Sequence, residues 1–366
     1  MKWTRGPRPT EASATVRPVM NVPSTGRVRR GAVIGLGMIG RHHARLLQSS
    51  DRVEFAGAVD PGGDRYRAVH DAALVFDSTD GLLGATGGAV DFAIVAVPTE
   101  LHLPVAESLA DAGVAMLIEK PLASSGEAAR QILALCHRAG VAGAVGHVER
   151  FNPALQEMRR RMLGGQIGRL FTVSTVRSGP FPSRIQDVGV VKDLATHDID
   201  LVSWLADSPI ATVAAQTQYL TGRDHEDLVL ATGALASGAA FNLVVDWVSP
   251  AKVRRARVLG ERGLLEADSL TGDLFFYENG EMGVVWSAAQ QFRGVSEGDV
   301  TRYALRREEP LRIEHETFLN LLDGRTDHDA EVVTLEKGVE IVEGAEAVLR
   351  SASSGETVRL AAFAGA

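Results

Sequence analysis

Asp193, His197 and Asp200 are the residues whose types and spacing first suggest chemistry. In a helix, positions i, i+4 and i+7 share one face, so an acid, an imidazole and a second acid would stand together. Such a set could bind a metal ion or could be a solvated charged face. No cysteine or further histidine completes a metal shell, and the apolar neighbours Leu194 and Ile199 weaken the solvated interpretation. We expect a helix over 190–206 that carries these residues at a site without metal.

A glycine motif gives the second chemical signal. Gly35, Gly37 and Gly40 follow a short apolar strand and open a helix. In the dinucleotide fingerprint, glycines at this spacing allow a tight turn, a close approach of the pyrophosphate and close packing of the helix on the sheet. Met38 and Ile39 complete the turn, at a helix N-terminus whose free N–H groups would face the phosphates. The motif predicts a dinucleotide cofactor.

Asp60 indicates which dinucleotide. It lies twenty residues past Gly40, at the end of an apolar strand, where a carboxylate can accept hydrogen bonds from both ribose hydroxyls. A 2'-phosphate would be repelled there, so the sequence favours NAD. Arg65 lies near enough in the sequence to keep NADP open as an alternative.

Two further strand ends carry polar residues. Pro98 and Thr99 follow one apolar strand, and we expect them to start the next helix with Thr99 as its cap and His102 close behind. Glu119 and Lys120 follow the next strand, immediately before a proline that fixes the turn. Lysine is rarely buried without a reason, so Lys120 is expected at the nicotinamide end of the cleft. The alternatives are a plain helix start and a surface Glu–Lys pair.

Short apolar strands alternate with helical stretches from residue 30 onward, which is typical of a parallel sheet with helices on both faces. The strands are expected at 31–35, 53–59, 91–97, 114–118 and 141–145, and two of the helices at 42–48 and 126–139. Ligands of such sheets lie beyond the carboxyl ends of the strands. We therefore expect the polar residues found there to contact the cofactor, namely Pro98, Thr99, His102, Glu119 and Lys120.

The chain of 366 residues exceeds one ordinary core, so we expect two domains. Residues 1–30 are predicted to be a flexible basic tail, 31–150 the NAD-binding Rossmann domain, and 151–366 an α+β domain. Whether the last helices of this domain return to the Rossmann side stays open. Period-two alternation after residue 165 predicts an open, mostly antiparallel sheet. Arg254, Arg255 and Arg257 are interpreted as a solvated face of one of its strands.

Charge and cysteine content narrow the class of protein. A net charge of −8 argues against general nucleic-acid or anionic-membrane binding, and no apolar run approaches the ~20 residues of a membrane span. The single Cys136 cannot form an internal disulfide and lies on an apolar helix face, so it is interpreted as a buried thiol. We expect a soluble protein of a reducing compartment, the cytoplasm.

The order of these motifs resembles a known family, that of glucose-fructose oxidoreductase, inositol dehydrogenase and the rhizopine-catabolism oxidoreductases (Gfo/Idh/MocA). The resemblance rests on Gly-x-Gly-x-x-Gly, then Val97-Pro98-Thr99 with His102, then Glu119-Lys120-Pro121, then Asp193-x-x-x-His197. It continues through 259–263, 314–322 and 336–350, and so covers nearly all of 31–361. The resemblance implies a Rossmann domain followed by an open-sheet domain whose free face makes a dimer or tetramer interface.

The same resemblance implies the active-site residues. Lys120, Asp193 and His197 match the lysine, aspartate and histidine of the family. Oxidation of a secondary alcohol needs a base for the hydroxyl proton while hydride leaves for the nicotinamide. His197 is the preferred base, Asp193 would orient the imidazole or hold a substrate hydroxyl, and Lys120 would stabilise the reacting oxygen. Whether Lys120 or His197 takes the proton stays open.

Two segments are similar to the branch that contains UDP-N-acetylglucosamine 3-dehydrogenases, namely 146–153 and 177–189. In them Arg150, Arg177 and Arg184 could grip an anionic substrate group, with Asn152 alongside, or could be surface arginines that flank a loop. Lys192 departs from the branch, which more often has an apolar residue before the aspartate. It is either a helix surface residue or an added positive charge in the pocket.

The resemblance therefore implies an NAD-dependent dehydrogenase that oxidises C3 of a UDP-N-acetylhexosamine to a 3-keto sugar. The alternatives are a dehydrogenase of a free cyclitol or sugar that uses the same residues, and a regulatory protein that binds NAD without turnover. The expected partners are a small-molecule sugar or sugar nucleotide and further copies of the chain.

Overall fold

Two sheets organise the chain in the computed structural model, which describes residues 27–181, 188–280, 297–325 and 332–360. The first sheet has the strand order β15-β6-β5-β4-β1-β2-β3. All its neighbouring strands pair in parallel except β15, which runs antiparallel to β6. Its strands are β1 (Arg29–Ile34), β2 (Val53–Val59), β3 (Val75–Phe76), β4 (Phe92–Val95), β5 (Ala115–Glu119), β6 (Gly143–Gly146) and β15 (Val333–Thr334).

Helices cover both faces of this sheet, which explains why its central strands are continuous apolar runs. These helices include α1 (Gly40–Gln48), α2 (Thr79–Ala85), α3 (His102–Asp111) and α4 (Gly126–Ala139), with short 3₁₀ turns η1 (Ala72–Leu74), η2 (Thr99–Leu101) and η3 (Val148–Phe151). The bounds of α4 follow from its caps. The Ser125 hydroxyl accepts a hydrogen bond from the Ala128 N–H, and Gly140 ends the helix at φ 65°.

The second sheet has nine strands in the order β14-β13-β12-β11-β7-β10-β9-β8-β16. Its neighbours pair antiparallel except β7 with β10, which are parallel. The strands are β7 (Leu170–Pro180), β8 (Ile210–Gln218), β9 (Leu228–Leu235), β10 (Ala240–Asp246), β11 (Val248–Gly260), β12 (Gly263–Asp268), β13 (Asp273–Asn279), β14 (Glu297–Tyr303) and β16 (Val358–Arg359). The predicted fold class, a Rossmann sheet followed by an open and mostly antiparallel sheet, is confirmed.

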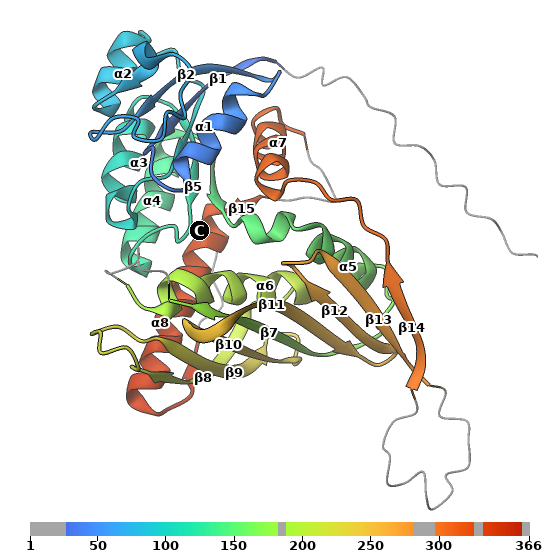
Figure 1. The fold of residues 1–366 in the computed structure, drawn as a ribbon. Coiled ribbons are helices and arrows are strands. Elements are labelled where there is room, and N and C mark those ends of the chain that lie inside the picture. The colour runs from blue at the N-terminus through green and yellow to red at the C-terminus, as the bar shows by residue number, and fades with distance from the viewer. Residues whose placement is uncertain (1–26, 182–187, 281–296, 326–331, 361–366) are drawn as a thin grey trace, which may run out of the picture.

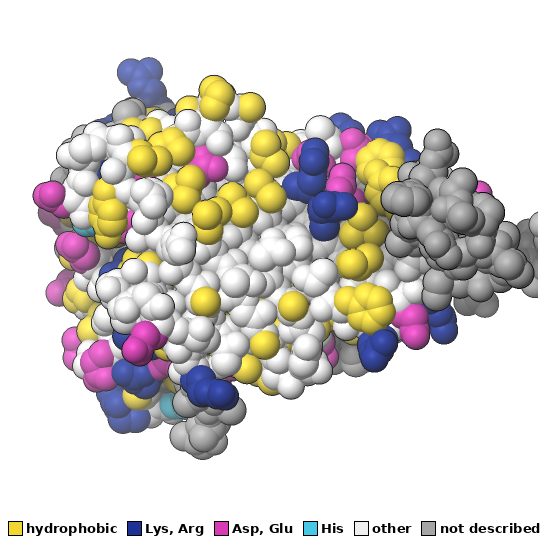
Figure 2. Space-filling model, turned by 90° about the horizontal axis from the view of Figure 1, so that it is seen from below, with side chains coloured by type: hydrophobic (Ala, Val, Ile, Leu, Met, Phe, Trp, Pro, Cys, Tyr) yellow, Lys and Arg dark blue, Asp and Glu magenta, His cyan; other side chains and the backbone are white. Residues whose placement is uncertain are grey.

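The helices that the structure describes beside the nine-stranded sheet lie on one side of it (Figure 1). They are α5 (Pro153–Leu163) and α6 (Thr196–Ala206), while α7 (Pro310–Leu322) lies near α1 and α8 (Leu335–Ser354) runs from the first sheet to the edge of the second. The opposite side of the large sheet is an open face of small and polar side chains with scattered apolar ones (Figure 2). Within the described ranges, no helix has the length and apolar content that crossing a membrane requires.

Three local predictions need correction. Thr99 does not cap a helix through its side chain; it begins the 3₁₀ turn η2, and α3 starts only at His102. The predicted helix 190–206 begins with a π turn, η4 (Val191–Ala195), and becomes α-helical at Thr196. The prediction also missed β3 and the parallel pairing of β7 with β10, since two-residue strands and long-range pairings leave little local signal.

Candidate active site

The glycine turn has the geometry that a dinucleotide phosphate needs. Gly35 has φ 99°, and a Cβ at Gly40 would come within 1.9 Å of the Gly35 carbonyl oxygen, so neither position tolerates a side chain. A Cβ at Gly37 would meet nothing within 4 Å, which leaves the turn open on the outside. Among the described residues, no acceptor is recorded for the N–H groups of Met38 and Ile39. These unpaired donors at the start of α1 fit an anionic group.

Asp60 lies at the end of β2, beside this turn. Its Oδ2 accepts a hydrogen bond from the Leu36 N–H at 2.9 Å, and its Oδ1 accepts one from the Gly62 N–H at 2.8 Å. The carboxylate is therefore fixed beside the glycine turn while its remaining lone pairs stay available. The Arg65 guanidinium packs over Gly62, because a Cβ there would lie 2.5 Å from Nη2. The two groups relevant to the choice between NAD and NADP thus lie together.

The residues after β4 divide into two groups. Pro98 is exposed and Thr99 half-buried at the carboxyl edge of the sheet. His102 is only 1 % exposed, and its ring nitrogens lie 3.1 Å from the Leu122 carbonyl oxygen and 3.2 Å from that of Val97. Burial lowers the pKa of His102, while the two carbonyl contacts act in the opposite direction. The sequence suggested a cofactor contact for His102, but the structure places it as a link between the turns that follow β4 and β5.

Lys120 and Asp193 meet across the two halves of the chain. The Lys120 Nζ donates to the Asp193 carbonyl oxygen at 2.8 Å and to its Oδ1 at 3.1 Å. Both side chains are more than four-fifths buried. The Asp193 Oδ2 is buried without a recorded partner in the described part of the chain. Asp193 therefore lies against Lys120. The two roles expected for it, orienting the imidazole or holding a substrate hydroxyl, stay predictions.

His197 lies one turn after Asp193 and is 9 % exposed. Its Nδ1 is buried and has no hydrogen-bond partner among the residues described. Burial, and then the nearby charges of Lys120 and Arg177, hold the pKa of His197 well below the usual value for histidine. The ring is therefore neutral at physiological pH, and the lowered pKa makes it a weaker base than an ordinary imidazole. The solvated charged face considered for this helix is wrong, since Asp193, His197 and Asp200 are all buried.

His147 is a second imidazole in the site that the sequence reasoning did not single out. It follows β6 directly, as Lys120 follows β5, so the strand-end rule could have found it. Its ring centroid lies 6.1 Å from that of His197, edge to face. Burial lowers the pKa of His147 to about 4, although the Asp200 carboxylate acts in the opposite direction. The site therefore contains two adjacent neutral imidazoles.

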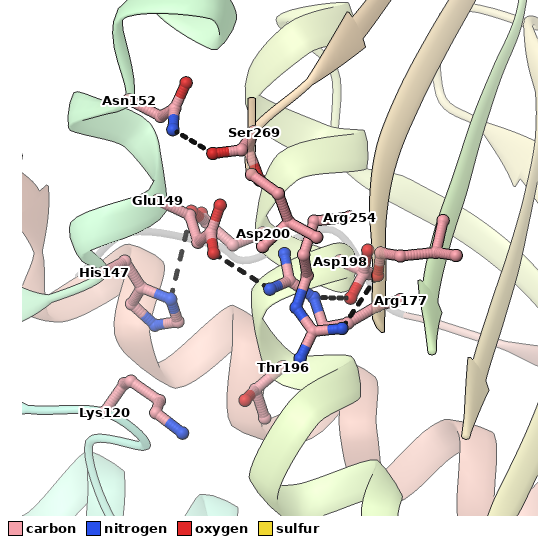
Figure 3. A network of polar contacts seen from close by, with 12 residues as sticks. Lys120, His147, Glu149, Asn152, Arg177, Thr196, Asp198, Asp200, Arg254 and Ser269 are labelled. Carbon is pink, nitrogen blue, oxygen red and sulfur yellow. Dashed lines mark hydrogen bonds and ion pairs between the residues drawn. The ribbon is translucent and has the colours of Figure 1, made fainter. Parts of the chain in front are cut away.

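The arginines expected to bind an anion are already paired. Arg150 makes a bidentate ion pair with Asp200, at 2.8 Å from Nε and 2.5 Å from Nη2. Arg177 donates to Asp198 at 2.5 Å and to Glu149 at 2.9 Å (Figure 3). Both guanidiniums are about 95 % buried.

The expectation that Arg150 and Arg177 present free charge to a substrate is thus not met, because carboxylates in the same domain neutralise them. Asn152 is likewise engaged in the fold. Its Oδ1 accepts from the Ala154 N–H at the start of α5, and its Nδ2 donates to the Ser269 carbonyl oxygen. Arg184 lies outside the described residues.

The basic residues on β11 point to opposite sides of the sheet. Arg255 and Arg257 are about half exposed and lie near Glu266 of β12, in agreement with a solvated face. Side chains alternate along a strand, so Arg254 points to the face opposite that of Arg255 and Arg257. It lies on the covered face, near Arg177 (Figure 3). Its assignment to the solvated face is therefore wrong. Lys192 donates to the Ser124 carbonyl oxygen near the surface, which agrees with a helix surface role.

A buried polar chain connects the Lys120 turn to α7, and the sequence reasoning missed it. The His315 Nε2 lies 2.7 Å from the His43 Nδ1, and the His43 Nε2 lies 2.9 Å from a Glu119 oxygen. The other Glu119 oxygen accepts from the Lys120 N–H at 3.1 Å. Glu119 therefore has structural partners and lies behind Lys120. Glu314 is fully buried beside it, and burial, together with the Glu119 charge, raises the pKa of Glu314 well above its usual value.

Comparisons with known proteins agree with this architecture. Residues 29–147 match the model of an oxidoreductase family with an NAD-binding Rossmann fold, and residues 155–266 match the GFO/IDH/MocA C-terminal domain. A UDP-N-acetylglucosamine 3-dehydrogenase from Acidithiobacillus ferrooxidans is 30 % identical over 296 residues, which is 80 % of this chain and 88 % of that protein. The myo-inositol dehydrogenase Hyg17 from Streptomyces leeuwenhoekii is 32 % identical over 253 residues, 64 % of this chain and 75 % of that one.

Solved structures show the same likeness. The Acidithiobacillus ferrooxidans enzyme superposes with a TM-score of 0.75 at 27 % identity, over 89 % of this chain and 98 % of that one. GenD2 from gentamicin A biosynthesis, crystallised in complex with NAD, superposes with a TM-score of 0.73 at 28 % identity, over 92 % and 97 % of the two chains.

Proposed function

The chain belongs to the Gfo/Idh/MocA family of NAD-binding oxidoreductases, and from this premise we propose that it oxidises the C3 hydroxyl of a UDP-N-acetylhexosamine to a 3-keto sugar. As a sugar-dehydrogenase homologue it acts on a CH–OH group. The observation that carries the proposal is the Lys120–Asp193 pair beside the neutral His197. A relative that shares 30 % identity over most of both chains, and whose name specifies this reaction, supports the choice of substrate.

The residues of the glycine turn fit a dinucleotide. Met38 and Ile39 would hold the pyrophosphate through their N–H groups and Asp60 the adenosine ribose, with Pro98 and Thr99 lining the cofactor's path. When bound, NAD supplies the acceptor for the hydride that leaves the sugar carbon. All other chemistry falls to side chains of the protein.

Lys120 and His197 divide that chemistry in our proposal. The Lys120 ammonium, held by Asp193, would donate a hydrogen bond to the reacting hydroxyl oxygen and stabilise negative charge as it develops. His197 would accept the hydroxyl proton through Nε2, since the ring is neutral and the enclosed nitrogen is Nδ1. Oxidation of a free cyclitol needs the same groups, and the likeness to a myo-inositol dehydrogenase makes it the second candidate.

The test is a substrate panel with the purified chain and NAD. UDP-N-acetylglucosamine, UDP-N-acetylgalactosamine, free N-acetylglucosamine and myo-inositol would be compared by NADH absorbance and product mass. We expect loss of two hydrogens from a UDP-N-acetylhexosamine, and single-turnover mixing would reveal it even if NADH stays bound. If only myo-inositol is oxidised, the protein is a cyclitol dehydrogenase and the proposed sugar-nucleotide substrate is wrong.

We propose that NAD is preferred over NADP because of the Asp60 charge. The Asp60→Asn variant keeps one acceptor for the backbone but loses the repulsion of a 2'-phosphate. We expect the ratio of kcat/KM for NAD to that for NADP to fall about tenfold or more, the size of one charged hydrogen bond. Asp51→Asn, at the opposite end of β2, is the matched control. An unchanged ratio in Asp60→Asn would refute this role.

We also propose that the open face of the nine-stranded sheet pairs two copies of the chain. The face is uncovered in Figure 2 and exposes apolar residues of several strands, including Leu230 at 45 % and Leu259 at 37 %. A sheet face of this size is normally covered. Leu230→Arg should reduce the mass measured by light scattering to that of a monomer, whereas Leu163→Arg on α5 should not. A wild-type monomer at micromolar concentration would exclude the proposal.

A further inference from the structure

Two arginines face each other on the covered side of the large sheet. Arg254 of β11 is the direct cross-strand partner of Arg177 of β7, and both have the parity of the buried positions on their strands. Like charges directly opposite each other destabilise a sheet. A local arrangement that opposes stability is a reason to look for function.

Neighbouring carboxylates balance only one of these charges. Arg177 is paired with Asp198 and Glu149, as described above. Arg254 donates from Nη1 to the carbonyl oxygens of Ser178 at 2.7 Å and Val253 at 2.8 Å. Within the part of the chain that the structure describes, no carboxylate oxygen lies within 4.0 Å of its guanidinium. Its Nε and Nη2 donors have no recorded partner there either.

Partial burial makes this imbalance costly. Arg254 is half-buried, so solvent reaches it but does not fully screen it. Burial, followed by the Arg177 charge, lowers the pKa of Arg254, while the carboxylates of Glu149 and Asp198 act in the opposite direction. The guanidinium nevertheless stays charged. A bound anion would remove the uncompensated part of this charge.

Arg254 also lies within electrostatic range of the reaction site. Its charge is among those that lower the pKa of His197, and the Asp193 carboxylate acts on Arg254 in turn. In Figure 3 the Arg254 and Arg177 side chains lie on one side of the polar group, and Lys120 and His147 lie on the other. A substrate held against Lys120 and His197 would therefore have a free guanidinium within electrostatic reach.

We propose that Arg254 binds an anionic oxygen group of the substrate, a phosphate of its nucleotide or a carboxylate on its sugar, through the Nε and Nη2 donors that the fold leaves unused. A guanidinium with two adjacent free donors can grip either group with two parallel hydrogen bonds. Arg177 opposite adds to the field but keeps its own carboxylates. This assignment rests on the proposed function and names the residue that selects charged sugars over neutral ones.

The test compares neighbouring residues on opposite faces of one strand. Arg254→Gln removes the charge, Arg254→Lys keeps it without the fork, and Arg255→Gln removes a charge from the open face as the matched control. We expect Arg254→Gln to raise KM for UDP-N-acetylglucosamine about 10-fold to 100-fold, with kcat changed much less. Arg254→Lys should recover part of the loss, and Arg255→Gln should match the wild type. Melting temperatures within a few degrees would establish that the variants fold.

Binding measurements on the NADH-loaded protein separate the sources of the anion. If UDP binds about tenfold more weakly to Arg254→Gln, the group is a nucleotide phosphate; if only UDP-N-acetylglucosaminuronate is affected, it is the sugar carboxylate. Unchanged KM and unchanged binding in Arg254→Gln, alongside wild-type turnover of UDP-N-acetylglucosamine, would overturn the inference and leave the proposed function intact. A wild type that oxidises only neutral cyclitols and binds no UDP would overturn both.

Discussion

Replacing Lys120 by alanine is expected to lower kcat by about 10³-fold while NAD affinity stays within a few-fold. Lys120 is the cation whose Nζ can both donate to the reacting oxygen and remain attached to Asp193. Its loss removes the stabilisation of developing oxygen charge, which is an interaction made most strongly in the transition state. The glycine turn and Asp60 are unaffected, so cofactor binding should persist. Single-turnover kinetics measure the rate of the chemical step, and a titration with NAD measures the affinity for the cofactor.

The control for this variant is Lys192→Ala. Lys192 lies just before Asp193, but its ammonium is bonded near the surface to the Ser124 carbonyl oxygen. Removing this ammonium should leave kcat within about twofold of the wild-type value, as is usual for a surface position. Because Lys120→Ala leaves Asp193 without its cation, the double variant with Asp193→Asn should be measured as a check on folding. Near-wild-type kcat in Lys120→Ala would mean that the reacting oxygen is stabilised elsewhere.

The cofactor half of the site was readable from the sequence because its signals are local. The glycine spacing and Asp60 lie within one strand–helix–strand unit, and α4 was predicted at its observed bounds, 126–139. Capping residues and hydrophobic period act over a few positions, so a single sequence carries them. Lys120 was identified for the same reason, because it directly follows an apolar strand and precedes a proline in the sequence.

The substrate half was less predictable because its pairings are distant in the sequence. Asp200, which neutralises Arg150, lies fifty residues away, and His315 lies 272 residues from His43. No spacing rule connects such partners, so Arg150 was expected to be free. Strand parity could have separated Arg254 from Arg255, but the three arginines of β11 were treated as one group. The sequence therefore shows that a residue is charged, but only the structure shows whether a nearby partner already neutralises that charge.

The second large effect expected is a loss of stability in mild acid, caused by buried neutral histidines. Burial lowers the pKa of His147, His197 and His315, and each lacks a carboxylate close enough to reverse this. The unfolded chain binds protons on these rings below about pH 6.5, whereas the folded chain does not. Below that pH the unfolded state therefore binds more protons, and the free energy of unfolding falls as the pH falls.

His147 gives the size of the effect and its test. Its pKa is lowered from 6.5 to about 4, so this residue alone would remove on the order of 3 kcal/mol between those pH values. Carboxylates with lowered pKa values, such as Asp200, lose their contribution only at lower pH. The raised pKa of Glu314 opposes the histidines in the window from about 6.5 to 4, so the effect of His147 is measured as a difference between variant and wild type. Urea unfolding of His147→Gln should show a shallower pH dependence there than the wild type, and the exposed His70→Gln should not. Equal slopes for His147→Gln and the wild type would mean that His147 gains a proton or a partner in the folded state, and its assignment as a neutral neighbour of His197 would have to be abandoned.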